Sequence, residues 1–488
     1  MVQKQGKLLE RKSIKNHIFQ GVDLAKDLIY SFNDVIVYFD PDVDGCIAGL
    51  LVCRFCAKHG IKFQWYINKN RSHDWTLPLE KVSGKDIIAV DFIITSVQVM
   101  NICDAGCNLV SMDHHVNGEN SIQYESDYGT SGVVVNNQYT NEDTDGRYLS
   151  GAGVVFETLI QLDPEFDTKE NRALVGITLL SDVRDIENPL AEGYLYTLYT
   201  HKYKGYIKYL IDFTIGEKDY GFGVPRMDRG YVDYKFSPAI NACLRFGEEE
   251  QVVNFFLGSH VLDLTCRENQ KQLVKNISEK LKVVDFKYLR VCYFYEKDFI
   301  EYAEVLPSFV GLVASKHLDG QSRSVICYLI SGNSPEEYQL KRVSFRGNIN
   351  GLDYQNALGV LFKCLGHKSA FGIKEMKPTK DTFVKANEIV SRVEVESNHH
   401  REIREITNLS FMINKIFKVA EDNLYLLSQN QIYYKYLGKN IKKHRSGANY
   451  VEYSVDGIPV MCFDKNITFE SGYIVPMLER GFINFYLQ

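Results

Sequence analysis

Residues 35–45 read Val-Ile-Val-Tyr-Phe-Asp-Pro-Asp-Val-Asp-Gly. The first five residues are apolar and rich in β-branched and aromatic types, which predicts a buried strand. Three carboxylates follow it at alternate positions, and a helix is expected from Ile47 to His59, with Gly60 suited to end it. A strand that passes through an acidic turn into a helix is typical of parallel α/β sheets, whose functional side chains gather at the carboxyl ends of the strands.

Four further clusters of acidic residues and histidines follow this one along the chain. They are Asp91 after Asp86–Val90, Asp113-His114-His115 after 107–112, Asp182 after 173–181, and the distant pair Gly366-His367. Because the first three of the five clusters each follow a β-type run, we expect them to converge at one edge of a sheet. Carboxylates and imidazoles gathered there would repel one another without a cation, and Mn²⁺ or Mg²⁺ accepts such oxygen and nitrogen ligands.

The predicted metal ligands are Asp40, Asp42, Asp44, Asp91, His114 and Asp182. Asp91 is the best candidate to bridge two ions, and Asp40 is expected to bind directly or through water. Two ions roughly 4 Å apart can activate water and hold a scissile phosphate, so no serine or cysteine nucleophile is required. His115 is predicted to contact the phosphate or act as an acid, and Asp113 to orient the histidines.

A calcium loop is the simplest alternative for the first cluster, but it fits poorly. An EF-hand loop needs a bidentate Glu at its twelfth position, where this chain has Leu51. The strand before the cluster and the helix after it also contradict a helix–loop–helix motif.

Composition limits the class of protein. The chain has 488 residues, of which 45% are hydrophobic and 24% charged, so several domains are expected. The net charge is −6, so any polyanionic partner must be held by local patches rather than by the whole surface. The 11 cysteines lack a framework spacing and no signal peptide precedes them, which predicts reduced thiols in a cytoplasmic protein without a membrane span. The pairs Cys53/Cys56 and Cys103/Cys107 leave a zinc site as a minor alternative.

The pattern of apolar runs predicts an α/β fold with two α/β domains joined by a helix, followed by a small β-rich domain. The expected segments are a lead-in at 1–30, an α/β domain with a parallel sheet at 31–195, a connecting region at 196–285, a second α/β domain at 286–385 and a β-rich module, OB-like as one option, at 386–488. Within the connecting region, residues 264–285 have the spacing of an amphipathic bridging helix.

The combination of Asp-x-Asp-x-Asp-Gly with Asp-His-His resembles the DHH phosphoesterase superfamily, and most closely its RecJ branch of single-strand-specific 5′→3′ exonucleases. Further similar segments are Leu149–Phe156, Phe236–Gly247, Gly311–Lys316, Ser344–Gly347 and Gly366–Gly372. The resemblance covers roughly residues 31–385. It implies a DHH domain followed by a DHH-associated domain that binds the substrate.

The same resemblance implies where the substrate lies. Arg346 and His367 are expected to hold phosphates, with Ser344 and Gly366 beside them and with Asn241 and Arg245 as further strand contacts. There are departures from the pattern: Ala239, Leu244 and Leu365 replace motif residues, and Tyr38 stands where many members have a metal-binding histidine. The chain is therefore a divergent relative, and the departures bear on the exact substrate and on one metal position.

The leading functional prediction is a Mn²⁺- or Mg²⁺-dependent exonuclease with two ions that acts on single-stranded DNA, with the 5′→3′ direction taken from the resemblance alone. The alternatives are a phosphodiesterase for short oligonucleotides or cyclic dinucleotides and, less favoured, a silent binding scaffold. A single-strand-binding protein or a helicase is a candidate recruiting partner.

One basic segment lies outside the resemblance. Residues 433–436 read Tyr-Tyr-Lys-Tyr, and Lys439, Lys442, Lys443 and Arg445 follow. Interleaved cations and aromatic rings suit a single strand, whereas a solvated basic β-hairpin is the favoured simpler interpretation.

Overall fold

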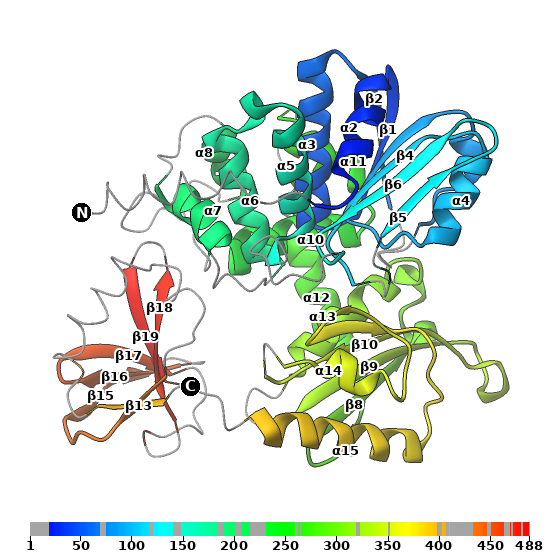
Figure 1. Cartoon of the computed structure of the whole chain (residues 1–488). Helices are drawn as coiled ribbons and strands as arrows, with labels where there is room; N and C mark the ends of the chain where they lie inside the picture. Colours follow the sequence, from blue (N-terminus) through cyan, green and yellow to red (C-terminus); the bar gives the residue numbers. More distant parts are fainter. Residues whose placement is uncertain are drawn as a thin grey trace.

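The computed structural model describes residues 19–68, 75–116, 119, 121–139, 148–182, 189–200, 206–214, 231–258, 262–263, 265–318, 323–349, 352–397, 403–406, 409, 433–446, 450–462, 469, 472–479 and 482–487. Figure 1 shows three sheets, each in a separate part of the molecule. The α/β fold with a parallel-rich first sheet and a β-rich C-terminal part confirms the predicted fold class.

The first sheet has the strand order β2-β1-β3-β4-β6-β5. Its strands are β1 (Asp34–Phe39), β2 (Lys62–Ile67), β3 (Asp86–Val90), β4 (Leu109–Asp113), β5 (Ile122–Glu125) and β6 (Ser131–Asn136). All neighbouring pairs are parallel except β5 with β6. The carboxyl ends of β1, β3 and β4 therefore meet at one edge, directly before the three acidic clusters.

Helices cover the faces of this sheet. They are α2 (Val22–Ser31), α3 (Val43–His59), α4 (Ser96–Asp104), α5 (Gly151–Leu162) and α6 (Lys169–Ser181). The helix α3 is buried along most of its length because it packs between β1 and the helices α5 and α6. It begins at Val43 rather than Ile47 and ends at Gly60, which has a left-handed φ of 71°.

A helical region follows, made of α7 (Pro189–Thr200), α8 (Tyr206–Thr214), α10 (Ser237–Arg245), α11 (Glu249–Phe256) and α12 (Thr265–Lys280). The helix α12 leads into the second sheet, as Figure 1 shows. The expected helix over 264–285 is too long at its end, because Lys282–Asp285 form strand β7 paired with β8. Val283 and Val284 are β-branched, and pairing with β8 outweighs the helical spacing of the apolar residues.

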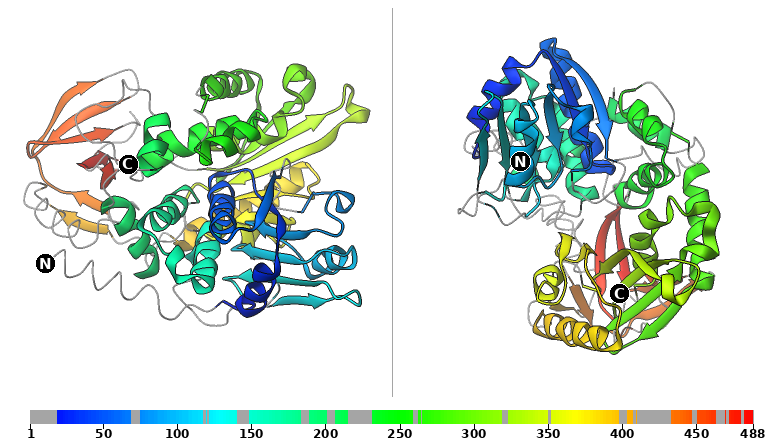
Figure 2. Two further views of the ribbon diagram at one scale, coloured as in Figure 1. Left: turned by 90° about the horizontal axis from the view of Figure 1, so that it is seen from above. Right: turned by 90° about the vertical axis from the view of Figure 1, so that its right-hand side faces the viewer.

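The second sheet has the order β11-β12-β10-β9-β8-β7. Its further strands are β8 (Leu289–Tyr295), β9 (Ser324–Ser331), β10 (Gln339–Arg346), β11 (Cys364–His367) and β12 (Ala370–Ile373). The helices beside it are α13 (Leu306–Lys316), α14 (Tyr354–Leu358) and α15 (Lys380–Ser397). Separate hydrophobic clusters lie on the α13 side and on the α15 side of this sheet. Figure 2 shows the first and second sheets as two lobes linked by the helices between them.

The third sheet has the order β13-β14-β18-β19-β17-β16-β15. The strands are β13 (Ile403–Ile406), β14 (Tyr433–Tyr436), β15 (Ile441–Ser446), β16 (Val451–Val455), β17 (Ile458–Cys462), β18 (Ile474–Glu479) and β19 (Phe482–Leu487). Within the described residues β13 and β15 are its two edges and do not pair with each other.

Candidate metal centre and substrate crevice

The first acidic cluster is held by the start of α3. Asp42 is the N-cap residue, and its Oδ1 accepts a hydrogen bond of 2.9 Å from the backbone N–H of Gly45. Asp44, in the first turn of the helix, accepts from the backbone N–H groups of Gly151 (2.7 Å) and Ala152 (3.0 Å). These two groups begin helix α5, whose positive dipole end favours a carboxylate. The Gly-Ala-Gly segment thus orients Asp44.

Asp91 follows β3 in an uncommon backbone conformation. Its φ is 64°, in the left-handed region that residues with a Cβ atom rarely adopt. Its side chain is buried, and Oδ1 lies 3.1 Å from Nε2 of His114. Gly151 packs so closely against it that a Cβ atom there would lie 2.5 Å from Oδ1 of Asp91. The backbone and the neighbouring helix therefore both fix the direction in which this carboxylate points.

The two histidines follow β4 and are almost completely buried. Nδ1 of His115 lies 2.8 Å from Oδ1 of Asp113, as expected if Asp113 orients a histidine. Asn136, at the end of β6, donates to the backbone carbonyl of His115 (3.0 Å) and to Oδ2 of Asp113 (3.4 Å). A carboxylate behind an imidazole sets its tautomer and direction, which is a common arrangement around metal ligands.

Every predicted metal ligand takes part in this centre. Asp182 caps the end of α6 and lies 3.8 Å from Nδ1 of His114. Three overlapping groups have ligand atoms within 4.8 Å of one another: Asp91, Asp113, His114 and His115; Asp44, His114 and Asp182; and Asp40, Asp42 and Asp91. Asp91 and His114 each belong to two groups. Asp91 is thus placed where the sequence predicted a bridging ligand, while its role stays a prediction.

The electrostatics of the centre fit a cation. Burial raises the pKa of Asp91 well above its ordinary value, and the negative charges of Asp44 and Asp42 raise it further. Burial also raises the pKa of Asp44, with Asp182 and Asp42 adding to the effect and the N–H groups of α5 opposing it. A bound cation reverses this penalty, because it favours the charged form of every carboxylate around it. The donors are carboxylate oxygens and imidazole nitrogens, which suit Mn²⁺ and, for the oxygens, Mg²⁺.

A crevice connects this centre with the second sheet. Its volume is about 350 Å³, and its lining includes Asp40 and Asp42 on one side and Ser344, Arg346 and Gly366 on the other. Arg245 from α10 and Gly311 from α13 also line it. Side chains from distant parts of the sequence therefore line one space, while phosphate binding by Ser344, Arg346 and Gly366 stays a prediction.

Arg346 is held firmly at the end of β10. Its Nη1 donates to Oγ of Ser344 (2.8 Å) and to the carbonyl of Phe345 (2.7 Å), and its Nε donates to Oγ of Ser315 (3.1 Å). Burial lowers the pKa of Arg346 to about 10, and nearby Arg342 adds to the shift. The guanidinium remains charged near neutral pH. It is thus a cation oriented in advance, which suits a phosphate.

The other predicted substrate residues are placed less uniformly. Arg245 ends α10, and its Nη1 donates to Gln270 on α12 (2.9 Å) while the residue also lines the crevice. Asn241 lies one turn earlier on α10 and is not among the described residues that line the crevice. His367 ends β11, where its backbone pairs with Ala370.

Two questions that the sequence raised, the role of Tyr38 and a zinc site on the cysteines, can be examined in the structure. Tyr38 is buried, stacks on Phe92 with ring centroids 4.6 Å apart, and its hydroxyl lies 3.0 Å from Oγ1 of Thr76. Burial raises its pKa, so it stays a neutral phenol. The zinc alternative has no support: the 11 cysteines are all outside disulfides, and none joins a metal-type group in the described part of the chain.

Several residues of the site were not predicted. Arg342, Lys374 and Glu304 line the crevice, and Asn136 supports the histidine pair. Arg342 could have been found, because it precedes Ser344 and Arg346 at alternate positions of a strand and so shares their face. No sequence pattern marks Asn136 as a site residue, because only the pairing of β6 with β4 brings it beside Asp113.

The sequence model of the DHH family, N-terminal domain, matches residues 34–180. This range spans the three clusters after β1, β3 and β4. Residues 34–180 form a DHH domain. A comparison with curated protein sequences finds no match. Solved structures, however, share the fold over most of the chain.

Three of these structures are RecJ proteins. RecJ of Thermus thermophilus in complex with Mn²⁺ is 17% identical, with a TM-score of 0.65 over 97% of this chain and 72% of that chain. The complex of RecJ from the same organism with Mg²⁺ is 16% identical, with a TM-score of 0.62 over 97% of this chain and 70% of that chain. An exonuclease RecJ bound to manganese is 19% identical, with a TM-score of 0.54 over 78% of this chain and 97% of that chain. The fold is therefore RecJ-like.

The DHH domain, the RecJ-like fold and the buried carboxylate–histidine centre together indicate a metal-dependent phosphoesterase. The centre fits the ions named in the similar structures by its donor types, as argued above. No helix in the described residues is both long and apolar enough to cross a membrane.

Proposed function

We propose that this DHH phosphoesterase is an exonuclease that hydrolyses phosphodiester bonds of single-stranded DNA, in the 5′→3′ direction. The observation that carries the proposal is the shared crevice: Asp40 and Asp42 of the metal centre face Ser344 and Arg346 across about 350 Å³. A phosphodiester bound there would meet carboxylate-held metal on one side and an oriented guanidinium on the other. The similar structures are described as RecJ and as an exonuclease, which supports the choice of substrate class.

The ligands would be Asp40, Asp42, Asp44, Asp91, His114 and Asp182, arranged as the overlapping groups described above. Two divalent ions held by them would supply Lewis-acid activation of water and of the scissile phosphate. The protein's own groups do the rest. Arg346 binds phosphate oxygens, since Ser344, Phe345 and Ser315 already orient it. Because it is oriented before binding, little side-chain entropy is lost.

His115 is the proposed acid or phosphate contact. Its Nδ1 is directed to Asp113, which leaves Nε2 as the nitrogen that can face a substrate oxygen. Asp113 stabilises the protonated ring and fixes its orientation. Burial of both groups excludes water from this hydrogen bond. We therefore expect His115 to affect turnover more than metal affinity, and His114 to affect both.

The alternative substrate class is a short oligonucleotide or a cyclic dinucleotide. The test compares 5′- and 3′-labelled DNA and RNA strands of about 5 and 40 nucleotides, incubated with Mn²⁺, Mg²⁺ or EDTA. Asp113→Ala/His114→Ala is the inactive variant. Lys385→Ala is the control, because Lys385 is exposed on α15 and does not line the crevice.

Metal-dependent loss of the 40-mer DNA from its 5′ end, absent from the inactive variant and kept by the control, is the expected result. Cleavage of only the short strands would instead favour the oligonucleotide function. No cleavage of any strand would reject both nuclease assignments and leave cyclic dinucleotides as the substrate to test.

A further inference from the structure

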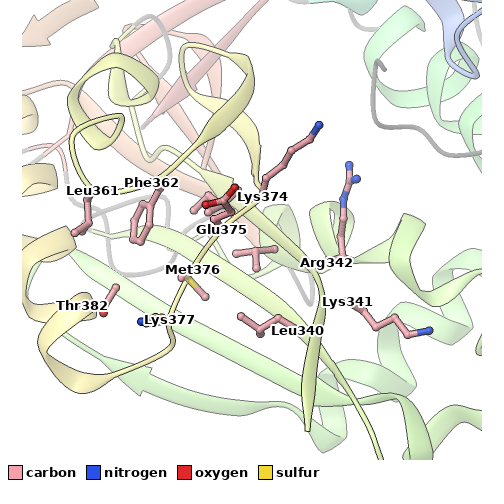
Figure 3. Close-up of a pocket in the computed structure, with 12 residues that line it drawn as sticks. Leu340, Lys341, Arg342, Leu361, Phe362, Lys374, Glu375, Met376, Lys377 and Thr382 are labelled. Atoms are coloured by element: carbon pink, nitrogen blue, oxygen red, sulfur yellow. The ribbon is translucent and has the colours of Figure 1, made fainter. Parts of the chain in front are cut away.

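A second cavity adjoins the crevice on the surface of the second sheet. Its volume is about 530 Å³, and it lies between β10 and the segment that follows β12, as Figure 3 shows. We call this cavity the β10 groove. It is lined by Leu340, Lys341, Arg342, Val343, Leu361, Phe362, Ile373, Lys374, Glu375, Met376, Lys377 and Thr382.

The groove exists because β12 is shorter than β10. The two strands pair only from Ser344 to Arg346 of β10, opposite Gly372 to Ala370. Before Ser344 the register of β10 with β12 does not continue. Apolar side chains of Leu361 and Phe362, which precede β11, fill the base of the opening. The result is an apolar floor beside a strand edge that β12 does not cover.

Cations dominate the rim. Lys341, Arg342, Lys374 and Lys377 line the groove together with one carboxylate, Glu375. Lys341 also pairs with Glu296 at 3.5 Å. Figure 3 shows Arg342 and Lys374 extending to the same side, away from Lys377 and Thr382. A cationic rim over an apolar floor is the chemistry that binds a nucleotide, with the phosphate at the rim and the base or sugar on the floor.

Arg342 and Lys374 connect the groove to the crevice. Both line the two cavities, as do Val343 and Ile373, so the two spaces adjoin at these four residues. Glu304 is a further carboxylate at the crevice, alongside Arg245 and Arg346. The charged residues of the crevice away from Asp40 and Asp42 are therefore four cations and one carboxylate.

We propose that the β10 groove is a second nucleotide-binding subsite, which holds a nucleotide of the strand away from the scissile bond. Arg342 and Lys374 carry the phosphate chain from the crevice into the groove. This proposal rests on the proposed function, because it assumes that a polynucleotide lies in the crevice. A second subsite would make the protein bind longer strands more tightly than dinucleotides.

The geometry of β10 supports more than one phosphate position. Arg342 and Arg346 are four residues apart on one strand, a separation of about 13 Å at roughly 3.3 Å per residue. The two side chains start from separate points along the strand and both line the crevice, so they can bind neighbouring phosphates of one strand. The volume of about 530 Å³ lies within the range of small-molecule sites and suits a single nucleotide.

The experiment measures the affinity for labelled oligothymidylates of about 2, 4, 8 and 16 nucleotides by anisotropy, in EDTA so that no hydrolysis occurs, across a range of salt concentrations. The variants are Arg342→Ala/Lys374→Ala, the charge-keeping Arg342→Lys/Lys374→Arg, and Lys377→Ala. The control is Lys385→Ala, an exposed lysine of α15 that lines neither cavity.

We expect the affinity of the unaltered protein to rise with length beyond the dinucleotide. The double alanine variant should lose about tenfold in affinity for the 16-mer. Its slope of log affinity against log salt concentration should become shallower by about 1.4, because each lost phosphate contact on a single strand removes about 0.7. Lys377→Ala should lose part of the affinity that the unaltered protein gains with strand length. The charge-keeping variant should retain the slope, and Lys385→Ala should match the unaltered protein.

Two results would overturn the subsite. One is affinity that does not depend on length in the unaltered protein, and the other is an unchanged salt slope in the double alanine variant. Hydrolysis of a dinucleotide with Mn²⁺ is measured separately, so a failed subsite with intact hydrolysis is distinguishable from a failed nuclease function.

Discussion

Replacing Gly151 with alanine should disable the metal centre without unfolding the protein. The added Cβ atom would lie 2.5 Å from Oδ1, 2.8 Å from Cγ and 3.0 Å from Cβ of Asp91. Ordinary contact begins at 3.4 Å, so the carboxylate must retreat by about 0.9 Å. Asp91 cannot swing freely, because its backbone sits at φ 64° and its neighbours in the centre are buried.

A misplacement of about 1 Å in a catalytic group can cost about 100-fold in rate, or roughly 2.7 kcal/mol of transition-state stabilisation. The fold should lose much less, because alanine is favoured over glycine in a helix by about 1 kcal/mol. The assay is Mn²⁺-dependent hydrolysis of a phosphodiester, with metal content and the thermal unfolding midpoint measured on the same preparation. We expect activity to fall about 100-fold, with a change of only a few degrees in the midpoint.

A double-mutant cycle with Asp91→Ala identifies the route of the effect. If Gly151→Ala acts by displacing Asp91, it should cause little further loss once that carboxylate is gone. If the activity losses of the two single variants add fully, Gly151→Ala acts elsewhere, for example on the N–H groups that bind Asp44. Normal metal content and more than a third of the original activity in Gly151→Ala would refute the reasoning, because the carboxylate would then tolerate the contact.

Other perturbations test separate parts of the site. Gly311→Ala places a Cβ atom 2.5 Å from Nη2 of Arg346, so KM for a strand should rise about tenfold with kcat and stability nearly unchanged in steady-state kinetics and melting. Mn²⁺ at about 100 times its Kd should stabilise the protein by about 2.7 kcal/mol in thermal unfolding, and His114→Ala should lose most of that gain. Burial raises the pKa of Glu157 from 4.5 to about 7, so the folded protein keeps a proton that the unfolded chain releases. Stability should therefore fall by on the order of 3 kcal/mol from about pH 4.5 to about pH 7, and Glu157→Gln should flatten that part of a denaturant-unfolding profile.

The ligands of the centre could be predicted because each follows a recognisable element end. Asp40, Asp91 and Asp113 come directly after apolar runs that could only be buried strands, and parallel strands place their carboxyl ends together. Asp182 follows a helix instead, so the rule for strand ends does not place it with the others. Its distance of 3.8 Å from Nδ1 of His114 depends on the packing of α6 against α3, which no local pattern reveals.

The aromatic residues of the third sheet show the opposite case. Tyr434 and Tyr436 are buried, and the hydroxyl of Tyr436 donates to Asp456 at 3.0 Å. They are core residues and cannot stack on bases, whereas Lys442 and Lys443 are exposed on β15. The solvated basic hairpin is therefore the better interpretation. Alternation along a strand fixes which side chains share a face, but it does not say which face is covered.

The backbone of Asp91 links the fold to the proposed chemistry. A residue with a Cβ atom in the left-handed region costs about 1 kcal/mol or more, and glycine or asparagine would fit it more easily. Glycine and asparagine have no negative charge, however, and Asp91 belongs to two of the three ligand groups. Neither residue could therefore replace it. Gly151 removes the steric conflict on the other side of the carboxylate. Gly151 at the start of α5 therefore leaves room for the carboxylate of Asp91. Asp91, directly after β3, supplies the negative charge from a strained backbone position.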